Sequence, residues 1–526
     1  MTRPDSTTLS ALLDELVDVR GEQVALIDEE RTCTYRELGE RASLVAGGLA
    51  RYGVGPGDRV AILMENRIEW VETMFAAMRL GATVVGVSTW AERRELRYFL
   101  EHSGANALVA TASFAGKAFT GELEAILGYE SQPAGSLDAE GVPDLDTVVL
   151  LGADRPGAVS FESLSEGTAH DVESDPNDPD DTALLLYTSG STSRPKGVPL
   201  LHGGIVENAY HIGERMHLTP DDRFWLVSPL FWSYGSANAL GAMLTHGASA
   251  VLQSQFDPEV AVELAAEHDC TVYYGMANMA RRIVNADNFD SEQLSFRTGT
   301  TIGQPEDVAF TMDRLGVEGI CNVYGSTETY GNCAVTDRTL PREVRLQTQG
   351  RPLPGQDIVI TDPETGERLE QGEVGEIRVG GRITPGYHDA PEVNREAFDE
   401  DGYLKMGDLG RLDEHGRIQF RGRLKNVIKT GGINVSALEV EEFIRTHPSV
   451  EQAYVVGLED EEKGEIVAAA VVPVDGASLT EAAVRDHCRE LSAYKRPVKI
   501  AITTADSLPE TDTGKIKRLA MTELFE

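Results

Sequence analysis

A run of hydroxyl and glycine residues that ends near a lysine is the sharpest chemical signal in the sequence. The segment YTSGSTSRPKGV, residues 187–198, directly follows the apolar run TALLL. Backbone N–H and side-chain O–H groups of such a loop can point toward one anion, and Lys196 adds a positive charge. The segment predicts a phosphate-binding loop at the end of a buried strand. Its first five residues after the tyrosine are Thr188, Ser189, Gly190, Ser191 and Thr192.

Two alternatives compete with this interpretation. A P-loop requires Gly-Lys followed by Ser or Thr, whereas Lys196 stands between Pro195 and Gly197, so a P-loop kinase or ATPase is disfavoured. A surface loop without a ligand has a similar composition. The position after a strand, and the absence of any lysine between Lys196 and Lys405, favour the phosphate site.

Four later segments occur together with this loop, and the set resembles the signature of the adenylate-forming superfamily. That superfamily includes acyl-CoA synthetases, luciferases and peptide-synthetase adenylation domains, and the pattern here is most similar to stand-alone acyl-CoA ligases. The resemblance covers about residues 11–520. The four segments are YGSTE (324–328), GYLKMGDLG (402–410), GRLKNVIKTGGINVSALEVEE (422–442) and LPETDTGKIKR (508–518).

The resemblance implies an ATP site. Tyr324 would lie against adenine, Asp408 would accept hydrogen bonds from both ribose hydroxyls, and Arg423 would donate to ribose or phosphate oxygens. Lys196 and the loop at 188–192 would hold the outer phosphates. The remaining ATP-binding residues of the YGSTE segment would be Gly325, Ser326 and Thr327.

The same resemblance implies a reaction between two anions. Attack of a carboxylate on the α-phosphate of ATP requires positive charge and alignment, and Lys515 would bridge the two groups. Mg²⁺ prefers oxygen ligands and keeps several waters, so Glu328 with phosphate oxygens would suffice to hold it. Lys196, Glu328 and Lys515 are therefore the expected catalytic residues.

The acid pocket departs from the pattern of the family. Many acyl-CoA synthetases have histidine where Trp232 stands, and Ile302 replaces the first glycine of a pair that ends at Gly303. Tyr274, Met276 and Ile302 predict a mixed aromatic and aliphatic pocket that favours an aromatic or medium-sized acid, and Phe231 is also expected to line it.

The acceptor is expected to be CoA. Gly431 and Gly432 resemble residues that line a pantetheine tunnel, and Lys425 falls at the hinge position of the family. The leading hypothesis is an ATP- and Mg²⁺-dependent acid-CoA ligase that alternates between two domain arrangements. Two alternatives stay open: transfer of the activated acid to a carrier-protein thiol or a nitrogen nucleophile, and a catalytically silent protein that senses nucleotide or acyl ligands.

The elements that must position these residues form an α/β fold. Short β-rich runs alternate with helical periods from residue 11 to about 110, with Val24–Ile27 among them, which predicts a parallel sheet. A second α/β unit extends to about residue 340, and a small β-rich unit covers 347–424. We expect a large N-terminal domain over residues 1–424 and a small, mobile α+β domain over residues 425–526. The acidic stretch 171–181 predicts a solvated linker.

Composition limits the partners and the location. The chain has 526 residues and a formal net charge of −39, a field that repels nucleic acid and anionic membrane surfaces. Apolar runs are too short for a spanning helix or a secretory signal, so a cytoplasmic enzyme is expected. The five cysteines form no C-x-x-C pair and are interpreted as packing residues. The sequence leaves the acid, the oligomeric state and the pathway open.

Overall fold

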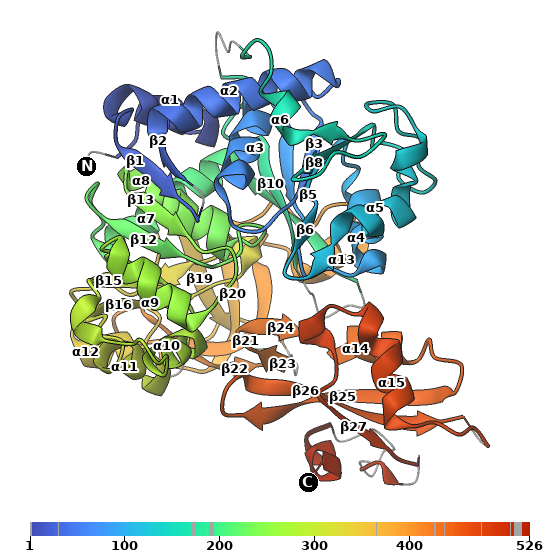
Figure 1. Ribbon diagram of the computed structural model, residues 1–526. Coiled ribbons are helices and arrows are strands. Elements are labelled where there is room, and N and C mark those ends of the chain that lie inside the picture. Colours follow the sequence, from blue (N-terminus) through green and yellow to red (C-terminus); the bar gives the residue numbers. More distant parts are fainter. Residues whose placement is uncertain are drawn as a thin grey trace. The chain divides into compact units, whose positions relative to one another are not determined.

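The computed structural model divides the chain into two compact units. It describes residues 3–29, 31–170, 175–188, 194–303, 305–363, 365–424, 428–435, 437–474, 476–504, 507–509 and 518–525. The first unit consists of Met1–Thr89, Arg97–Tyr187 and Gly197–Gly422, and the second of Trp90–Leu96, Thr188–Lys196 and Arg423–Glu526. Figure 1 labels the elements along the chain.

The first sheet has seven strands in the order β11-β10-β4-β3-β5-β8-β9. Its central pairs β10–β4, β4–β3, β3–β5 and β5–β8 are parallel, as predicted, and strands buried on both faces account for the continuous apolar runs. The strands are β3 (Arg59–Leu63), β4 (Thr83–Gly86), β5 (Ala107–Thr111), β8 (Thr147–Leu151), β9 (Val159–Ser160), β10 (Thr182–Thr188) and β11 (Lys196–Leu201).

The second sheet has nine strands in the order β18-β17-β16-β15-β14-β12-β13-β1-β2. It corrects one expectation, because β1 pairs in parallel with β13 here and does not join the first sheet. The pairing crosses more than 200 residues, a distance that local periodicity cannot encode. The strands are β1 (Val24–Ile27), β2 (Thr32–Thr34), β12 (Arg223–Leu226), β13 (Ser249–Leu252), β14 (Val272–Tyr274), β15 (Thr298–Thr301), β16 (Gly319–Tyr324), β17 (Ala334–Val335) and β18 (Arg351–Pro352).

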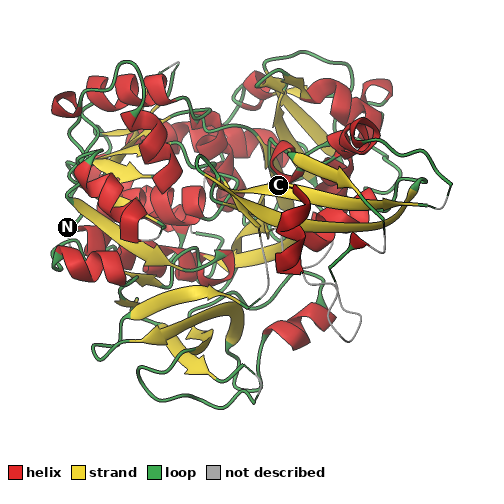
Figure 2. Cartoon of the chain, turned by 90° about the horizontal axis from the view of Figure 1, so that it is seen from below, coloured by secondary structure: helices red, strands yellow, loops and turns green. Residues whose placement is uncertain are grey.

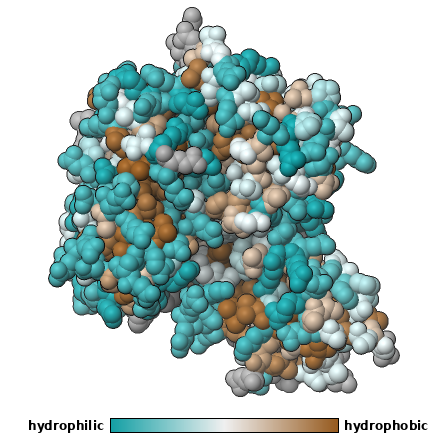
Figure 3. All heavy atoms as spheres, viewed as in Figure 1, coloured by the Kyte–Doolittle hydropathy of each residue, from teal (hydrophilic) through white to brown (hydrophobic). Residues whose placement is uncertain are grey.

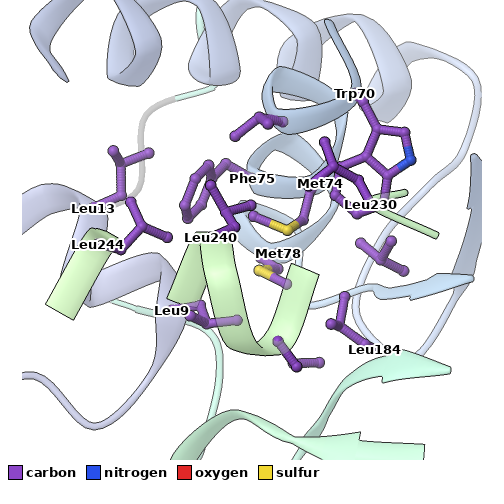
Figure 4. Close-up of a cluster of buried hydrophobic side chains, with 14 of the residues drawn as sticks. Leu9, Leu13, Trp70, Met74, Phe75, Met78, Leu184, Leu230, Leu240 and Leu244 are labelled. Carbon is purple, nitrogen blue, oxygen red and sulfur yellow. The ribbon is translucent and has the colours of Figure 1, made fainter. Parts of the chain in front are cut away.

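Helices from distant parts of the chain pack together in the core of the first unit. Figure 4 shows Leu9 and Leu13 of the first helix, Trp70 and Phe75 of the third, and Leu240 and Leu244 of a later pair around one cluster. The cluster also contains Leu184 of β10 and Leu226 of β12, so both sheets contribute to this hydrophobic cluster. Helices of this unit, some continuing into the second, are α1 (Leu9–Arg20), α2 (Tyr35–Arg51), α3 (Ile68–Arg79), α4 (Arg93–Ser103), α5 (Phe119–Leu127), α6 (Phe161–Leu164), α7 (His202–Met216), α8 (Gly241–His246), α9 (Pro258–Glu267), α10 (Ala277–Val284), α11 (Pro305–Asp313), α12 (Arg342–Gln347) and α13 (Pro391–Ala397), with a π-helix at Tyr234–Leu240.

The predicted β-rich segment forms a separate four-stranded sheet. Its order is β19-β20-β21-β22, with antiparallel β19–β20 and β20–β21 pairs and a small core that contains Ile358, Ile377 and Ile418. The strands are β19 (Gln356–Thr361), β20 (Gly375–Gly381), β21 (Leu404–Leu412) and β22 (Ile418–Arg423). The two α/β layers and this sheet confirm the fold predicted for the N-terminal part.

The C-terminal part has its own sheet and core. Long antiparallel strands β25 and β26 form its centre, and β27 pairs with β26 in parallel. Figure 2 draws the strands of the chain in yellow and its helices in red. The core contains Val440, Val455 and Val471, among others. The elements are β23 (Ile428–Thr430), β24 (Ile433–Val435), α14 (Ala437–Ile444), β25 (Val450–Asp460), β26 (Gly464–Pro473), α15 (Glu481–His487) and β27 (Lys499–Ile502).

The surface is largely hydrophilic on the face that Figure 3 shows. Across the described residues, no helix combines the length and the apolar character that crossing a membrane requires. All five cysteines are buried and reduced, which agrees with their interpretation as packing residues.

Candidate functional site

The predicted site residues of the first unit gather at one edge of the second sheet. Strands β12, β14, β15 and β16 are parallel neighbours. Tyr274 ends β14, Thr301 ends β15 and Tyr324 ends β16, and the segment with Phe231 and Trp232 follows β12. The carboxyl ends of parallel strands share one edge, where open α/β sheets bind ligands. The chain order therefore brings the expected adenine and acid residues together.

A direct hydrogen bond joins Tyr324 and Asp408. The Tyr324 hydroxyl donates to Oδ2 of Asp408 at 2.9 Å, and both residues are buried. Tyr324 is contributed by β16 and Asp408 by β21, so the bond joins the second α/β sheet to the four-stranded sheet. The ring of Phe420 lies 6.1 Å from that of Tyr324. The structure thus groups the residues expected for adenine and ribose.

Two asparagines donate hydrogen bonds to the turn after Tyr324. Ser326 N donates to the hydroxyl of Thr329, and Tyr330 has a left-handed φ of 58°. Such a conformation is rare for a bulky residue and needs support from its surroundings. Asn208 and Asn238 both donate to the carbonyl of Tyr330. Both asparagines lie outside the five motifs.

Glu328 lies on this turn and contacts the segment between β20 and α13. The hydroxyl of Tyr387 donates to its Oε1 at 2.7 Å, and Thr384 N donates to its carbonyl at 2.7 Å. No cluster of three or more metal-ligating side chains occurs among the described residues. A lone carboxylate suits Mg²⁺, which keeps waters and takes further oxygens from substrate phosphates. Sequence reasoning missed Tyr387, which lies outside all five motifs.

The residues expected to bind the acid differ in exposure. Phe231 and Tyr274 are buried, Trp232 and Gly303 are partly buried, and Ile302 is 39% exposed. Tyr274 packs within the core against the ring of Tyr234, at 4.6 Å between ring centroids. Their role in acid binding stays a prediction.

Close contacts fix the segment that carries Phe231. A Cβ atom on Gly86, the last residue of β4, would lie 2.8 Å from Leu186 and 3.0 Å from the carbonyl oxygen of Phe231. Ser233 Oγ is 3.0 Å from the hydroxyl oxygen of Thr327. The Phe231 segment therefore contacts both the first sheet and the turn that carries Glu328.

Several expected residues lie outside the described part of the chain. These are Ser189, Gly190, Ser191 and Thr192 of the phosphate loop, Lys425 at the hinge and Lys515. Thr188 ends β10, so the loop follows a buried strand, as predicted; Lys196 begins β11, a second strand of the same sheet that the sequence did not predict. Arg423 ends β22, and its side chain is not described.

Gly431 and Gly432 form the tight turn between β23 and β24. Their φ angles are 58° and 81°, and Thr430 pairs with Ile433 across them. A two-residue hairpin with both φ angles positive is a type I′ turn, which favours glycine at both positions. The glycines thus have a conformational reason to be present in the second unit, and a tunnel role stays a prediction.

The cysteines beside Tyr324 have no nucleophilic character. Burial raises the pKa of the Cys321 and Cys333 thiols to about 12, so both stay protonated near neutral pH. This supports a reaction in which the attacking groups belong to the substrates.

Comparison with known proteins identifies the family. The model of the AMP-binding enzyme family matches residues 13–388, and that of the AMP-binding enzyme C-terminal domain matches residues 439–515. The chain belongs to the AMP-binding enzyme family. This AMP-binding enzyme is 32% identical over 535 residues to YngI of Bacillus subtilis (strain 168), which has the provisional name of an acyl-CoA synthetase. The match covers 98% of this chain and 97% of YngI.

Two solved structures share the fold of this AMP-binding enzyme over nearly its full length. A variant of the o-succinylbenzoate CoA synthetase MenE of Bacillus subtilis has a TM-score of 0.82 at 28% identity, covering 97% of this chain and 98% of MenE. The amide bond synthetase McbA of Marinactinospora thermotolerans has a TM-score of 0.83 at 26% identity, covering 98% of this chain and 99% of McbA. The likeness confirms the predicted fold class.

Proposed function

We propose that this AMP-binding enzyme is an ATP-dependent acid-CoA ligase. The observation that carries the proposal is the grouping of Tyr324, Glu328 and Asp408 at the carboxyl edge of the second sheet. The similarity of the chain to acyl-CoA synthetases over nearly its whole length supports the same activity.

The proposed reaction has two steps. An oxygen of the acid attacks the α-phosphorus of ATP, the bond to pyrophosphate breaks, and acyl-AMP forms. The thiolate of CoA then attacks the acyl carbon, and AMP leaves with the electron pair of its bond to that carbon. Because the nucleophile arrives with each substrate, the protein has to bind, align and neutralise charge rather than form a covalent bond.

Each group of the proposed ATP site has a task. Tyr324 covers the adenine, and Asp408 accepts hydrogen bonds from the ribose. Glu328 binds Mg²⁺, which when bound neutralises charge on the phosphate oxygens. Lys196 with the loop at 188–192 binds the outer phosphates, and Lys515 aligns the acid carboxylate with the α-phosphate.

The acid and acceptor sides are proposed in less detail. Phe231, Trp232, Tyr274, Ile302 and Gly303 are proposed to border an aromatic or medium-sized acid. In the second unit, Gly431 and Gly432 border the CoA path, Arg423 helps to bind ATP, and rotation about Lys425 exchanges the two half-reactions. A cytoplasmic location is proposed, and the five buried cysteines without disulfide bonds agree with it.

A second candidate changes only the acceptor. McbA has the same fold and is an amide bond synthetase, and Trp232 stands where many acyl-CoA synthetases have histidine. A nitrogen nucleophile or a carrier-protein thiol would then take the acyl group. Pyrophosphate release with a panel of acids, with and without CoA, followed by mass spectrometry of the products, separates the two. A CoA thioester supports the ligase, whereas acid-dependent pyrophosphate without a thioester supports the alternative.

A further inference from the structure

Tyr387 contacts the carboxylate that the proposed function assigns to the metal. Its hydroxyl lies 2.7 Å from Oε1 of Glu328, although 59 residues separate them. In this hydrogen bond the phenol O–H is the donor and the carboxylate oxygen is the acceptor. The hydrogen bond therefore joins a neutral donor to an ionised acceptor, which is stronger than a bond between two neutral groups.

The backbone of Tyr387 is held by a residue of α13. The amide of Tyr387 donates to Oδ1 of Asn394 at 2.7 Å, and Nδ2 of Asn394 donates back to the carbonyl of Tyr387 at 2.9 Å. The preceding residue, Gly386, has a φ of 140°, a conformation that L side chains rarely adopt. These contacts fix the backbone from which the Tyr387 side chain extends to Glu328.

The same segment also holds the backbone of Glu328 and the strand after the phosphate loop. Thr384 N donates to the carbonyl of Glu328 at 2.7 Å, and the Thr384 hydroxyl donates to the carbonyl of Pro199 at 2.8 Å. His388 N donates to the carbonyl of Gly197 at 2.8 Å. Residues 384–388 thus tie Glu328 to β11 through both backbone and side-chain bonds.

We propose that Tyr387 is a positioning residue for the metal ligand, an inference that rests on the proposed function of Glu328. By occupying Oε1, the phenol fixes the rotation of the carboxylate and leaves Oε2 as the oxygen offered to Mg²⁺. A tyrosine suits this task because it is neutral. A lysine or arginine in its place would fix the same oxygen but cancel the charge that attracts the cation.

The proposal explains why one carboxylate suffices. A glutamate side chain loses rotamer freedom when it binds a cation, and a bond that has already fixed it reduces that cost. Residues that orient a metal ligand in this way are typically worth about 10- to 100-fold in metal affinity.

The test compares Tyr387→Phe with Tyr403→Phe. The control removes the same kind of hydroxyl in the same unit. The Tyr403 hydroxyl also donates to a carboxylate, that of the exposed Asp357, which has no proposed role in metal binding. Calorimetry measures binding of α,β-methylene-ATP, which cannot release pyrophosphate, once with excess Mg²⁺ and once with EDTA. We expect Tyr387→Phe to raise the dissociation constant with Mg²⁺ by about tenfold and to leave the EDTA value unchanged. Tyr403→Phe should change neither value.

Three further results decide the matter. Asn394→Ala, which frees the backbone of Tyr387, should weaken binding with Mg²⁺ in the same direction and covers the case in which Tyr387→Phe does not fold. Tyr387→Phe binding that equals the wild type with Mg²⁺, while Glu328→Gln binding is weakened, would overturn the positioning role alone. If Glu328→Gln also leaves Mg²⁺-dependent binding intact, Glu328 is not the metal ligand and the inference about Tyr387 fails with it. The proposed function is tested separately, by acid-dependent pyrophosphate release from the wild type.

Discussion

The hydroxyl of Tyr324 lies 2.9 Å from Oδ2 of Asp408, 84 residues further along the chain. The bond couples two residues that the family pattern assigns to different parts of the nucleotide. It also joins two sheets, so we expect nucleotide binding and the packing of the four-stranded sheet to depend on the same contact.

Removing that hydroxyl should affect stability and ATP binding together. In Tyr324→Phe a buried carboxylate loses a donor, which typically costs about 1–3 kcal/mol. We expect a lower melting temperature and a higher KM for ATP, with less effect on the KM for the acid. Thermal unfolding and initial rates check this, with Tyr403→Phe as control. An unchanged melting temperature would show that the bond contributes nothing to stability.

The Phe231 segment should respond to a single methyl group on the first sheet. Gly86→Ala places a Cβ atom 2.8 Å from Leu186 and 3.0 Å from the carbonyl oxygen of Phe231, distances at which something must shift. Because Phe231 is expected to border the acid, the KM for the acid should rise more than that for ATP. Gly121→Ala, where nothing lies within 4 Å of the new Cβ, is the control. Equal changes in both KM values would argue against an acid pocket at Phe231.

Stability should fall in mild acid because of His202. The imidazole is fully buried, its Nδ1 accepts a hydrogen bond from Leu9 N, and burial lowers its pKa to about 4. The unfolded chain binds this proton near pH 6.5, and the folded chain only near pH 4. Stability is therefore lost as the pH falls through this window, by about 3 kcal/mol in full.

Urea unfolding between pH 7.5 and pH 4 measures this loss. His202→Asn keeps an acceptor for Leu9 and should flatten the pH dependence, whereas His415→Asn, at an exposed position, should not. A pH profile that His202→Asn leaves unaltered would assign the acid sensitivity to other groups.

The two half-reactions should separate in Lys515→Ala. If Lys515 serves adenylation and the second unit then rotates, acyl-AMP formation should be lost while CoA transfer from preformed acyl-AMP suffers less. Single-turnover assays of each step measure this. Equal losses in both steps would contradict domain alternation.

The motifs in the sequence predicted which residues belong to the candidate site. The strands before these motifs end at a shared sheet edge, as the α/β pattern requires. The phosphate loop follows the buried strand β10, and Tyr324 ends β16, because apolar runs that break into polar turns mark strand ends. Local patterns do not contain long-range pairing, so the placement of β1 beside β13 and the bond between Tyr387 and Glu328 required the structure. Likewise, the residues around Tyr274 in the sequence do not indicate the contact between its ring and that of Tyr234.

The most direct test of the account is the product formed from a panel of aliphatic, aryl and amino acids with ATP and Mg²⁺, with and without CoA. We predict that at least one acid gives pyrophosphate, AMP and, when CoA is present, a CoA thioester identified by mass spectrometry. Acid-dependent pyrophosphate release that never yields a thioester would contradict the ligase and direct the search to carrier proteins and nitrogen nucleophiles.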